Sequence, residues 1–194
     1  MQVQSSPEKT LFLDRDGVIN KEKHYLHRVE DFEFIDGIFE LCQAAVQSGY
    51  GLIIVTNQSG IARGYYTEQQ FHDLMSWVVS EFAKREITIS DVFYCPHHPI
   101  QGTGRYRIDC ACRKPKPNML LEAAKKHNLN LSESILVGDK LSDIKAGQSA
   151  RLRTTALVGT GHTVSEQAKQ TADVFAGSLA ELKQILFPVS ITAD

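Results

Sequence analysis

The sequence predicts an α/β fold in which a mostly parallel sheet carries helices on both faces. Short apolar or β-branched runs alternate with amphipathic stretches along most of the 194 residues. Such alternation is typical of parallel strands joined by crossover helices. No internal repeat interrupts it, and a chain of this length can bury one sizeable core. We therefore expect a single domain over residues 1–194.

Each element has a recognisable signal in the chain. The apolar runs predict strands at residues 10–14, 51–57, 92–95, 134–139, 154–158 and 173–176. A helix over residues 38–48 is predicted to end at Gly49, and another to begin near Asn118. Three helix starts resemble capping boxes, in which a hydroxyl residue precedes Glu or Gln by three positions. These pairs are Thr67 with Gln70, Thr163 with Glu166, and Ser178 with Glu181.

Composition narrows the class of function. Lys and Arg number 21 against 23 Asp and Glu, a formal charge of −2, so the chain lacks the basic excess of sequence-independent nucleic-acid binders. No apolar run approaches the roughly 18 to 20 residues needed to cross a bilayer. The first ten residues lack the apolar stretch of a secretory signal and are expected to form a frayed lead-in. We expect a cytoplasmic protein with no nucleic-acid or membrane partner.

The most informative segment is LFLDRDG, residues 11–17, where an apolar run ends in two aspartates. Strand alternation places Asp14 and Asp16 on the same side as the chain leaves the strand. Two close anions repel unless a cation or a proton lies between them, or unless one acts as a nucleophile and the other transfers protons. The alternative is an Asp-x-Asp that only caps a loop.

Two further segments offer groups that suit an anion. Thr56, Asn57 and Ser59 follow the run GLIIV and can donate hydrogen bonds to anion oxygens, although they would also suit a simple turn. Arg113 and Lys114 precede a proline and the predicted helix start near Asn118, where the helix dipole favours phosphate. The alternative for this pair is solvated surface.

The fourth segment is VGDKLSD, residues 137–143. Gly138 is expected to let the chain turn at the strand end, and Asp139 and Asp143 offer the oxygen ligands that Mg²⁺ prefers. Lys140 is placed to pair with a carboxylate or with substrate. Asp143 also suits an early-helix carboxylate that only favours the macrodipole, and both interpretations stay open here.

Three of the four cysteines cluster with a histidine in the irregular insert at residues 96–117 and its flank. Cys95, His97, Cys110 and Cys112 supply three thiolates and an imidazole, the composition of a closed structural zinc site. A reduced cluster and a disulfide are the alternatives, and the cytoplasm disfavours the disulfide. Cys42 lies in an apolar helical pattern and is expected to be a buried thiol. His98 and His127 are expected to make only solvent or local hydrogen bonds.

Taken in order, the four segments resemble the haloacid dehalogenase (HAD) superfamily of phosphotransferases, from about residue 11 to about residue 186. The resemblance implies a Rossmann-like sheet of the HAD type. It implies that Asp14 is the nucleophile that forms an aspartyl-phosphate, and that Asp16 is the general acid and base. Thr56 and Lys114 would stabilise the transferring phosphoryl group, and Mg²⁺ would be held by Asp14, Asp139 and the backbone carbonyl of Asp16.

Within that superfamily the chain resembles a zinc-bearing branch without a large cap domain, in which heptose-1,7-bisphosphate 7-phosphatases and histidinol-phosphate phosphatases occur. The segments LDRDGVIN, FEFIDG, VTNQSGIARG, CPHHP, CRKPKPNML and VGDKLSD, with the long interval from His97 to Cys110, favour the heptose group. The resemblance implies a Mg²⁺-dependent step of ADP-heptose and lipopolysaccharide-core synthesis, and a monomeric enzyme whose partner is a small sugar bisphosphate. Substrate contacts would come from Glu22, Lys23, His24, Tyr25, Thr56, Asn57, Gln58, Ser59, Arg113, Lys114 and Lys140.

Three alternatives remain open at this level. A histidinol-phosphate phosphatase would need an acidic contact for the substrate amine. A non-catalytic, zinc-stabilised binding module would not need five intact catalytic positions, which are Asp14, Asp16, Thr56, Lys114 and Asp139. A DNA-end phosphatase would need a basic groove, and the net charge of −2 offers it little support.

Overall fold

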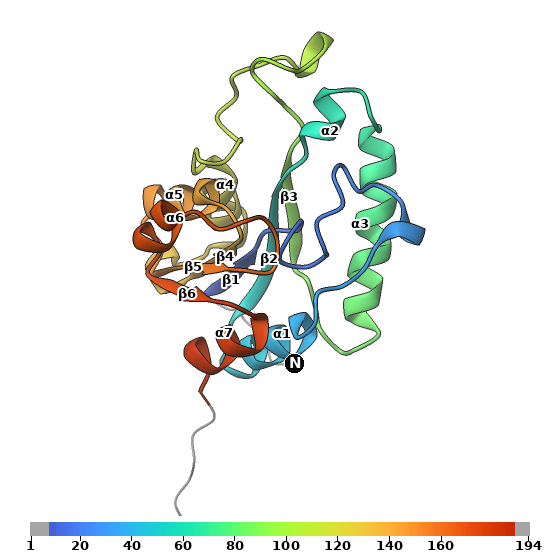
Figure 1. The fold of residues 1–194 in the computed structure, drawn as a ribbon. Helices are drawn as coiled ribbons and strands as arrows, with labels where there is room; N and C mark the ends of the chain where they lie inside the picture. The colour runs from blue at the N-terminus through green and yellow to red at the C-terminus, as the bar shows by residue number, and fades with distance from the viewer. Residues whose placement is uncertain (1–7, 189–194) are drawn as a thin grey trace, which may run out of the picture.

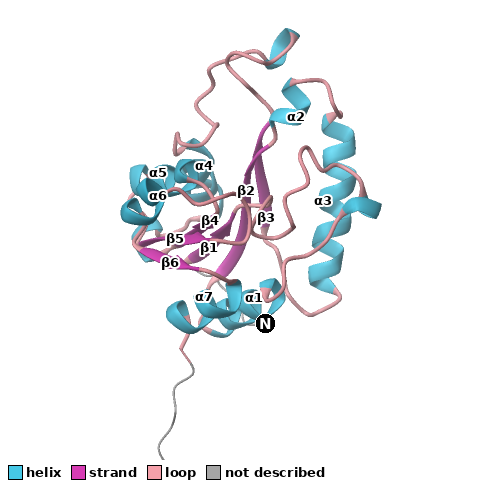
Figure 2. Cartoon of the chain, in the orientation of Figure 1, coloured by secondary structure: helices cyan, strands magenta, loops and turns pink. Residues whose placement is uncertain are grey.

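A computed structural model describes residues 8–188 of the chain. In this part of the chain six strands form one parallel sheet in the order β3-β2-β1-β4-β5-β6 (Figure 2). All six predicted strands agree with the observed ones to within one residue at each end. The observed strands are β1 (Thr10–Leu13), β2 (Gly51–Asn57), β3 (Asp91–Cys95), β4 (Ile135–Gly138), β5 (Thr154–Val158) and β6 (Val174–Ala176).

Helices cover both faces of the sheet, as the alternating pattern predicts (Figure 1). Apolar residues of α1, α3 and α7 pack on one face, and those of α4 and α5 pack on the other, where α6 joins α5. The helices are α1 (Ile38–Gln47), α2 (Ser59–Ala62), α3 (Glu68–Ala83), α4 (Asn118–His127), α5 (Leu141–Ser149), α6 (Glu166–Thr171) and α7 (Leu179–Leu186). Short 3₁₀ turns, which the sequence analysis did not predict, lie at Val29–Asp31, Gly104–Tyr106 and Leu131–Glu133.

The central strands divide their side chains between the two faces. Leu11 and Leu13 of β1 belong to the cluster under α1, α3 and α7, whereas Phe12 belongs to the cluster under α4 and α5. Because successive strand residues point to opposite faces, a strand covered on both sides must be apolar throughout. This explains why the strands appear in the sequence as continuous apolar runs rather than as alternating patterns.

The helix caps confirm two of the three predicted starts. Thr67 and Gln70 form both halves of a capping box at α3, and Ser178 accepts a hydrogen bond from the backbone N–H of Glu181 at α7. The prediction for Thr163 is wrong, because Ser165 is the N-cap of α6 and accepts from the N–H of Ala168. Two hydroxyl residues lie close together here, and only the backbone conformation selects the cap. At α1, Gly49 follows the helix with φ +82°, as expected of a C-terminal glycine.

The insert at residues 96–117 extends beyond the carboxyl end of the sheet beside α2 (Figure 1). It contains one 3₁₀ turn, Gly104–Tyr106, and hydrogen bonds join it to the rest of the fold. None of the helices within residues 8–188 combines the length and apolar character that crossing a membrane requires. The predicted lead-in falls mostly on residues 1–7, which lie outside the described residues; β1 begins at Thr10.

Candidate active site

The sequence-predicted polar residues meet at the carboxyl ends of β1, β2 and β4, where ligands bind in open parallel sheets. Two adjoining pockets of about 180 and 190 Å³ lie there. They share four lining residues, namely Asp16, Asn57, Ser59 and Lys140. The first is also lined by Glu22, His24, Tyr25, Gln58, Gly60, Tyr66 and His162, and the second by Asp14, Arg113, Lys114, Ser142 and Asp143.

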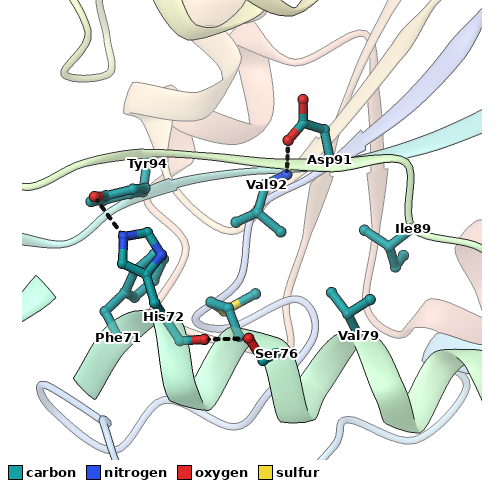
Figure 3. Close-up of a pocket in the computed structure, with 9 residues that line it drawn as sticks. Phe71, His72, Ser76, Val79, Ile89, Asp91, Val92 and Tyr94 are labelled. Carbon is teal, nitrogen blue, oxygen red and sulfur yellow. Dashed lines mark hydrogen bonds between the residues drawn. The ribbon is translucent and has the colours of Figure 1, made fainter. Parts of the chain in front are cut away.

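A larger hollow of about 460 Å³ lies elsewhere, between α3 and the edge strand β3 (Figure 3). Its lining is mostly apolar and shares no residue with the two polar pockets. Asp91 is the carboxylate on its rim, and that side chain is paired with Lys126 and His127. The hollow therefore lacks the paired carboxylates and free cations that phosphoryl chemistry requires.

Lys114 joins two carboxylates at the centre of the second pocket. Its Nζ lies 2.8 Å from Asp14 Oδ1 and 2.7 Å from Asp143 Oδ1, and it also donates to the carbonyl of Val55. Burial lowers the pKa of Lys114, but Asp14 and Asp143 outweigh that effect, so the pKa lies above its usual value. The amine is therefore a permanent cation beside Asp14, which is where an anionic substrate needs one.

The backbone of Lys114 is held separately from its amine. Asn57 donates from Nδ2 to the Lys114 carbonyl and accepts the Lys114 N–H at Oδ1, both at 3.1 Å. Asn57 ends β2, so this pair of bonds ties the start of the α4 segment to the sheet. The position of Lys114 thus depends on the strand as well as on the insert before it.

Burial raises the pKa of Asp14 to about 6, although Lys114 opposes the rise. The unfolded chain releases this proton near 3.8, so between these values the folded chain binds more protons. Asp14 therefore lowers the stability of the metal-free protein progressively as pH rises from about 4 to about 7, by up to about 3 kcal/mol.

We expect the Asp14→Asn variant not to lose this stability as pH rises, because an amide does not titrate in this range. In urea titrations of magnesium-free protein, the variant should gain stability over the wild type between about pH 4 and about pH 7. Groups that do not interact with Asp14 contribute equally to both proteins and cancel, whereas the pKa of Asp139, which Asp14 raises, falls in the variant and adds to the same gain. Parallel pH dependences of the two proteins would contradict the expectation.

Asp16 has a different environment from Asp14. Its Oδ1 accepts from Arg15 at 2.6 Å and from Asn20 Nδ2 at 3.1 Å, and its Oδ2 accepts from Gln58 Nε2 at 3.1 Å. Burial raises the pKa of Asp16, but Arg15 outweighs that effect and the net pKa lies below the usual value. Two carboxylates separated by one residue thus differ in proton affinity in the metal-free protein, because their neighbours differ.

Asp139 presents an oxygen without a partner to the same centre. Ligand atoms of Asp14, Asp139 and Asp143 lie within 4.8 Å of one another. Asp139 Oδ1 is buried and has no hydrogen-bond partner within residues 8–188. Burial and the nearby Asp14 raise the pKa of Asp139. An orphaned buried oxygen among three hard carboxylates fits a Mg²⁺ ligand set, in which oxygen donors and partial burial are usual. Both Asp16 carboxylate oxygens already accept hydrogen bonds, from Arg15, Asn20 and Gln58, so its backbone carbonyl is better available to such an ion.

Asp143 performs the helix role that the sequence suggested and also contacts Lys114. Its Oδ2 accepts the Lys140 N–H at 3.0 Å at the start of α5, while its Oδ1 pairs with Lys114. As expected, β4 ends at Gly138 and the chain bends directly after it, although the φ of Gly138 is not positive. A Cβ at position 138 would lie 2.2 Å from the Asp143 Cβ, so the glycine is also needed for this close approach.

The predicted substrate contacts divide into those that line the pockets and two, Lys23 and Thr56, that do not. Glu22, His24 and Tyr25 line the first pocket, and Arg113 lines the second, where it donates to the His97 carbonyl at 3.1 Å. Lys23 instead pairs with Glu33 and does not line either pocket. His24 and Tyr25 both have positive φ, a backbone conformation that the sequence does not reveal.

Thr56 and Gln58 are coupled at the end of β2. Gln58 Nε2 donates to Thr56 Oγ1 at 2.8 Å as well as to Asp16, and its Oε1 accepts from the Tyr66 hydroxyl. Both side chains are buried. Gln58 is thereby oriented by Tyr66 with its amide toward Asp16 and the phosphoryl side of the site.

The cysteine insert brings its four predicted ligands together. Ligand atoms of Cys95, His97, Cys110 and Cys112 lie within 4.8 Å of one another, and Cys110 Sγ is 3.3 Å from both other sulfurs. All are free cysteines, so the disulfide alternative is not found. The hydrogen bond between Cys95 and Cys112 lowers the pKa of Cys112 and raises that of Cys95. Three converging sulfurs and an imidazole fit the donor set of a structural zinc site.

Sequence reasoning missed four residues of this site: Arg15, Asn20, Tyr66 and His162. Each contacts a predicted residue: Arg15 and Asn20 bind Asp16, Tyr66 binds Gln58, and His162 binds Asp139. Arg15 alone had a signal in the sequence, because it lies between the two aspartates directly after an apolar strand. The structure shows that it is buried there. His98 makes the local contact expected of it, and Cys42 is buried. The prediction for His127 is wrong, because its Nε2 lies 2.7 Å from Asp91, which is 36 residues away.

Comparisons with known proteins agree on one kind of enzyme. Residues 111–182 match the HAD-hydrolase-like family. The chain is 45% identical over 179 residues to a D-glycero-beta-D-manno-heptose-1,7-bisphosphate 7-phosphatase from Pasteurella multocida, covering 92% of this chain and 97% of the relative. A protein of the same name from Escherichia coli K12 is 43% identical over 91% of this chain and 92% of its own length.

Solved structures with the same fold include close functional relatives of those proteins. The D,D-heptose 1,7-bisphosphate phosphatase of B. bronchiseptica, in complex with magnesium and phosphate, superposes with a TM-score of 0.76 at 26% identity, over 92% of this chain and 97% of that one. A HAD-like phosphatase from Mesorhizobium loti has a TM-score of 0.75 at 31% identity, over 91% and 87% of the two chains.

Proposed function

Because this chain belongs to the HAD-like hydrolase family that includes the D-glycero-beta-D-manno-heptose-1,7-bisphosphate 7-phosphatases, we propose that it removes the 7-phosphate of the β-anomer of that bisphosphate. The observation on which this rests is the convergence of Asp14, Lys114 and Asp139 at the carboxyl end of the sheet. Arg113 and Lys140, which also line the site, offer further positive charge for a substrate with two phosphates.

The reaction begins with Asp14. Its carboxylate attacks phosphorus in line, a P–O bond forms to Asp14, and the bond from phosphorus to the sugar oxygen breaks. Mg²⁺ bound by Asp14, Asp139 and the Asp16 carbonyl would supply the charge neutralisation that lets a carboxylate approach a phosphate dianion. Lys114 and Thr56 donate to the phosphoryl oxygens as charge develops on them.

Asp16 moves the protons. It gives a proton to the leaving sugar oxygen, and the carboxylate so formed then takes a proton from the water that attacks the phosphorus of the aspartyl-phosphate. Arg15 holds the pKa of Asp16 low in the free protein. An arriving phosphate dianion raises that pKa by like-charge repulsion, so the proton is bound when the leaving group needs it.

We further propose that the Cys95–His97–Cys110–Cys112 set binds structural zinc. All four positions are occupied by protein ligands, which leaves no site for substrate. Its role would be to order residues 96–117 and so to place Arg113. This arginine follows the proposed ligand Cys112 and donates to the backbone carbonyl of the proposed ligand His97.

A direct comparison of substrates tests the proposed specificity. We expect kcat/KM for the β-heptose 1,7-bisphosphate to exceed that for histidinol phosphate by at least roughly 100-fold, since two charged hydrogen-bonding contacts are lost with the second phosphate. Released phosphate is measured for both substrates and for the α-anomer. Faster turnover of histidinol phosphate, or of the α-anomer, would replace the proposed substrate.

Histidinol phosphate remains the second candidate because Glu22 lines the first pocket and is an acidic side chain available to an amine. However, Glu22 Oε1 already accepts the His24 N–H at 2.8 Å, and Oε2 lies 3.7 Å from His162 Nε2. Both contacts reduce the capacity of this carboxylate for a substrate amine, which favours the sugar.

A further inference from the structure

The loop that follows β5 contacts Asp139 from the side opposite the Asp14 cluster. Asp139 Oδ2 accepts two hydrogen bonds from His162. One comes from the backbone N–H at 3.0 Å, and the other comes from the ring Nδ1 at 2.7 Å. A carboxylate oxygen only accepts when ionised, so Nδ1 is the ring nitrogen that carries the proton in this contact. One residue therefore satisfies Oδ2 twice.

Two glycines make this approach possible. A Cβ at Gly17 would lie 2.3 Å from Asp139 Oδ2, and a Cβ at Gly161 would lie 2.2 Å from it. Neither distance is possible for a real side chain, so both positions must stay without one. The Thr160 hydroxyl donates to the Gly17 carbonyl at 2.7 Å and joins the β5–α6 loop to the loop after β1. Asp139 Oδ2 is thus enclosed by two loops that are distant in sequence.

The other oxygen of the same carboxylate has the opposite environment. Asp139 Oδ1 is buried and has no hydrogen-bond partner in the described part of the chain. Asp139 also belongs to the cluster in which its carboxylate lies within 4.8 Å of those of Asp14 and Asp143. Leaving a buried polar atom unsatisfied costs about 1–3 kcal/mol, and more when it is charged. A carboxylate held by one oxygen and left open at the other is preorganised to bind a cation through the open oxygen.

We propose that His162 is a positioning residue for the metal site, and that it orients Asp139 so that Oδ1 faces the bound cation. This deepens the proposed function and rests on its metal-dependent chemistry. His162 also borders the first pocket, with its side chain 37% exposed and Nε2 3.7 Å from Glu22. A contact with the sugar alone would change KM for substrate and leave cation affinity unchanged, so the two roles are separable.

Cation binding is measured without substrate or turnover. Zinc-loaded protein is titrated with Mn²⁺ as a stand-in for Mg²⁺, and free Mn²⁺ is followed by electron paramagnetic resonance. His162→Ala removes the ring donor and is expected to weaken Mn²⁺ binding about 10- to 100-fold, the usual effect of losing a partner of a metal ligand. His162→Asn keeps an amide N–H near the Nδ1 position and should recover most of the affinity. His162→Gln places its amide near Nε2 instead and should not.

His127→Ala is the matched control. His127 Nε2 lies 2.7 Å from Asp91 on the outer side of the sheet, so this variant also removes a histidine from a carboxylate but does so away from the site. It should bind Mn²⁺ as the wild type does. If His162→Ala does not fold, the comparison of His162→Asn with His162→Gln provides the second test, because only the asparagine keeps a donor near the Nδ1 position; equal Mn²⁺ affinity of these two variants would then overturn the proposal.

The proposal is overturned if folded His162→Ala binds Mn²⁺ as tightly as the wild type, or if His162→Asn is as weak as His162→Ala. These results are independent of the sugar. If the wild type bound Mn²⁺ but failed to hydrolyse the heptose bisphosphate, the substrate assignment would fail while the role of His162 stood. If heptose bisphosphate turnover were normal and Mn²⁺ affinity unchanged in His162→Ala, only the role of His162 would fail.

Discussion

Asp14→Asn is expected to lower kcat for heptose bisphosphate hydrolysis on the order of 10⁴-fold or more. An amide oxygen is a far weaker nucleophile than a carboxylate, and no other side chain of the pocket is placed to take over the attack. Asp14 is almost fully buried beside Lys114. The isosteric amide keeps the shape of the site, so the loss of activity should occur in a folded protein. Phosphate release under saturating Mg²⁺ measures the effect.

Trapping of the covalent intermediate distinguishes attack by Asp14 from direct attack by water. Acid quench during turnover of substrate with a radiolabelled 7-phosphate should leave label bound to the wild-type protein and none bound to Asp14→Asn, and beryllium fluoride should bind on Asp14 of the wild type in the acyl-phosphate geometry. Asp73→Asn is the control, because Asp73 is exposed on α3 and bonds only to Gln69. If Asp14→Asn retained the activity of the control, Asp14 would not be the nucleophile.

The second large effect is expected from loss of the cysteine set. Cys110→Ser, or removal of zinc by a chelator, should raise KM for the bisphosphate about 10- to 100-fold while kcat falls less. Structural zinc contributes on the order of 10 kcal/mol to the folding of small peptides, and the insert at residues 96–117 has little apolar burial of its own. Without the ion we expect this insert to open and Arg113 to lose its anchor on the His97 carbonyl.

The KM-to-kcat split follows from how the two adjacent cations are held. Arg113 bonds to a residue inside the insert, whereas Lys114 is held by Asn57, Asp14 and Asp143, which lie outside it. Steady-state kinetics and limited proteolysis of the insert give the two readouts. Cys42→Ala is the matched control, since Cys42 is a buried thiol of α1 away from the set. Unchanged KM in Cys110→Ser, or an equal effect of Cys42→Ala, would contradict the role assigned to the insert.

Local signals in the chain were sufficient to predict the framework that holds the site. Continuous apolar runs predict buried parallel strands because both faces of such a sheet are covered, and β2 and β5 have the predicted bounds. The Thr67 capping box is local too, since its two hydrogen bonds join residues three positions apart. The predictions failed where a local pattern had two solutions, as with Thr163 and Ser165. The close packing of Gly138 against Asp143 was not visible in the sequence.

The candidate site divides along the same line. Asp14, Asp16 and Asp139 were found because each follows a strand, and strand ends of a parallel sheet meet at one edge. Lys23 was predicted to contact substrate but pairs with Glu33, which lies ten residues along the chain and is not indicated by the local pattern. His162 was missed because nothing near it in the chain indicates Asp139, which is 23 residues away.

The sequence alone determined which residues end the strands, and hence which chemical groups gather at the edge of the sheet, because strand periodicity and caps depend on neighbours along the chain. Only the tertiary structure decided the partners of those groups. Lys114 reaches Asp14 across 100 residues, and His162 reaches Asp139 from the loop after another strand. Such contacts depend on how separate loops pack against one another. Their hydrogen bonds and burial, rather than residue type, set the proton affinities of Asp14 and Asp16 and leave one Asp139 oxygen free.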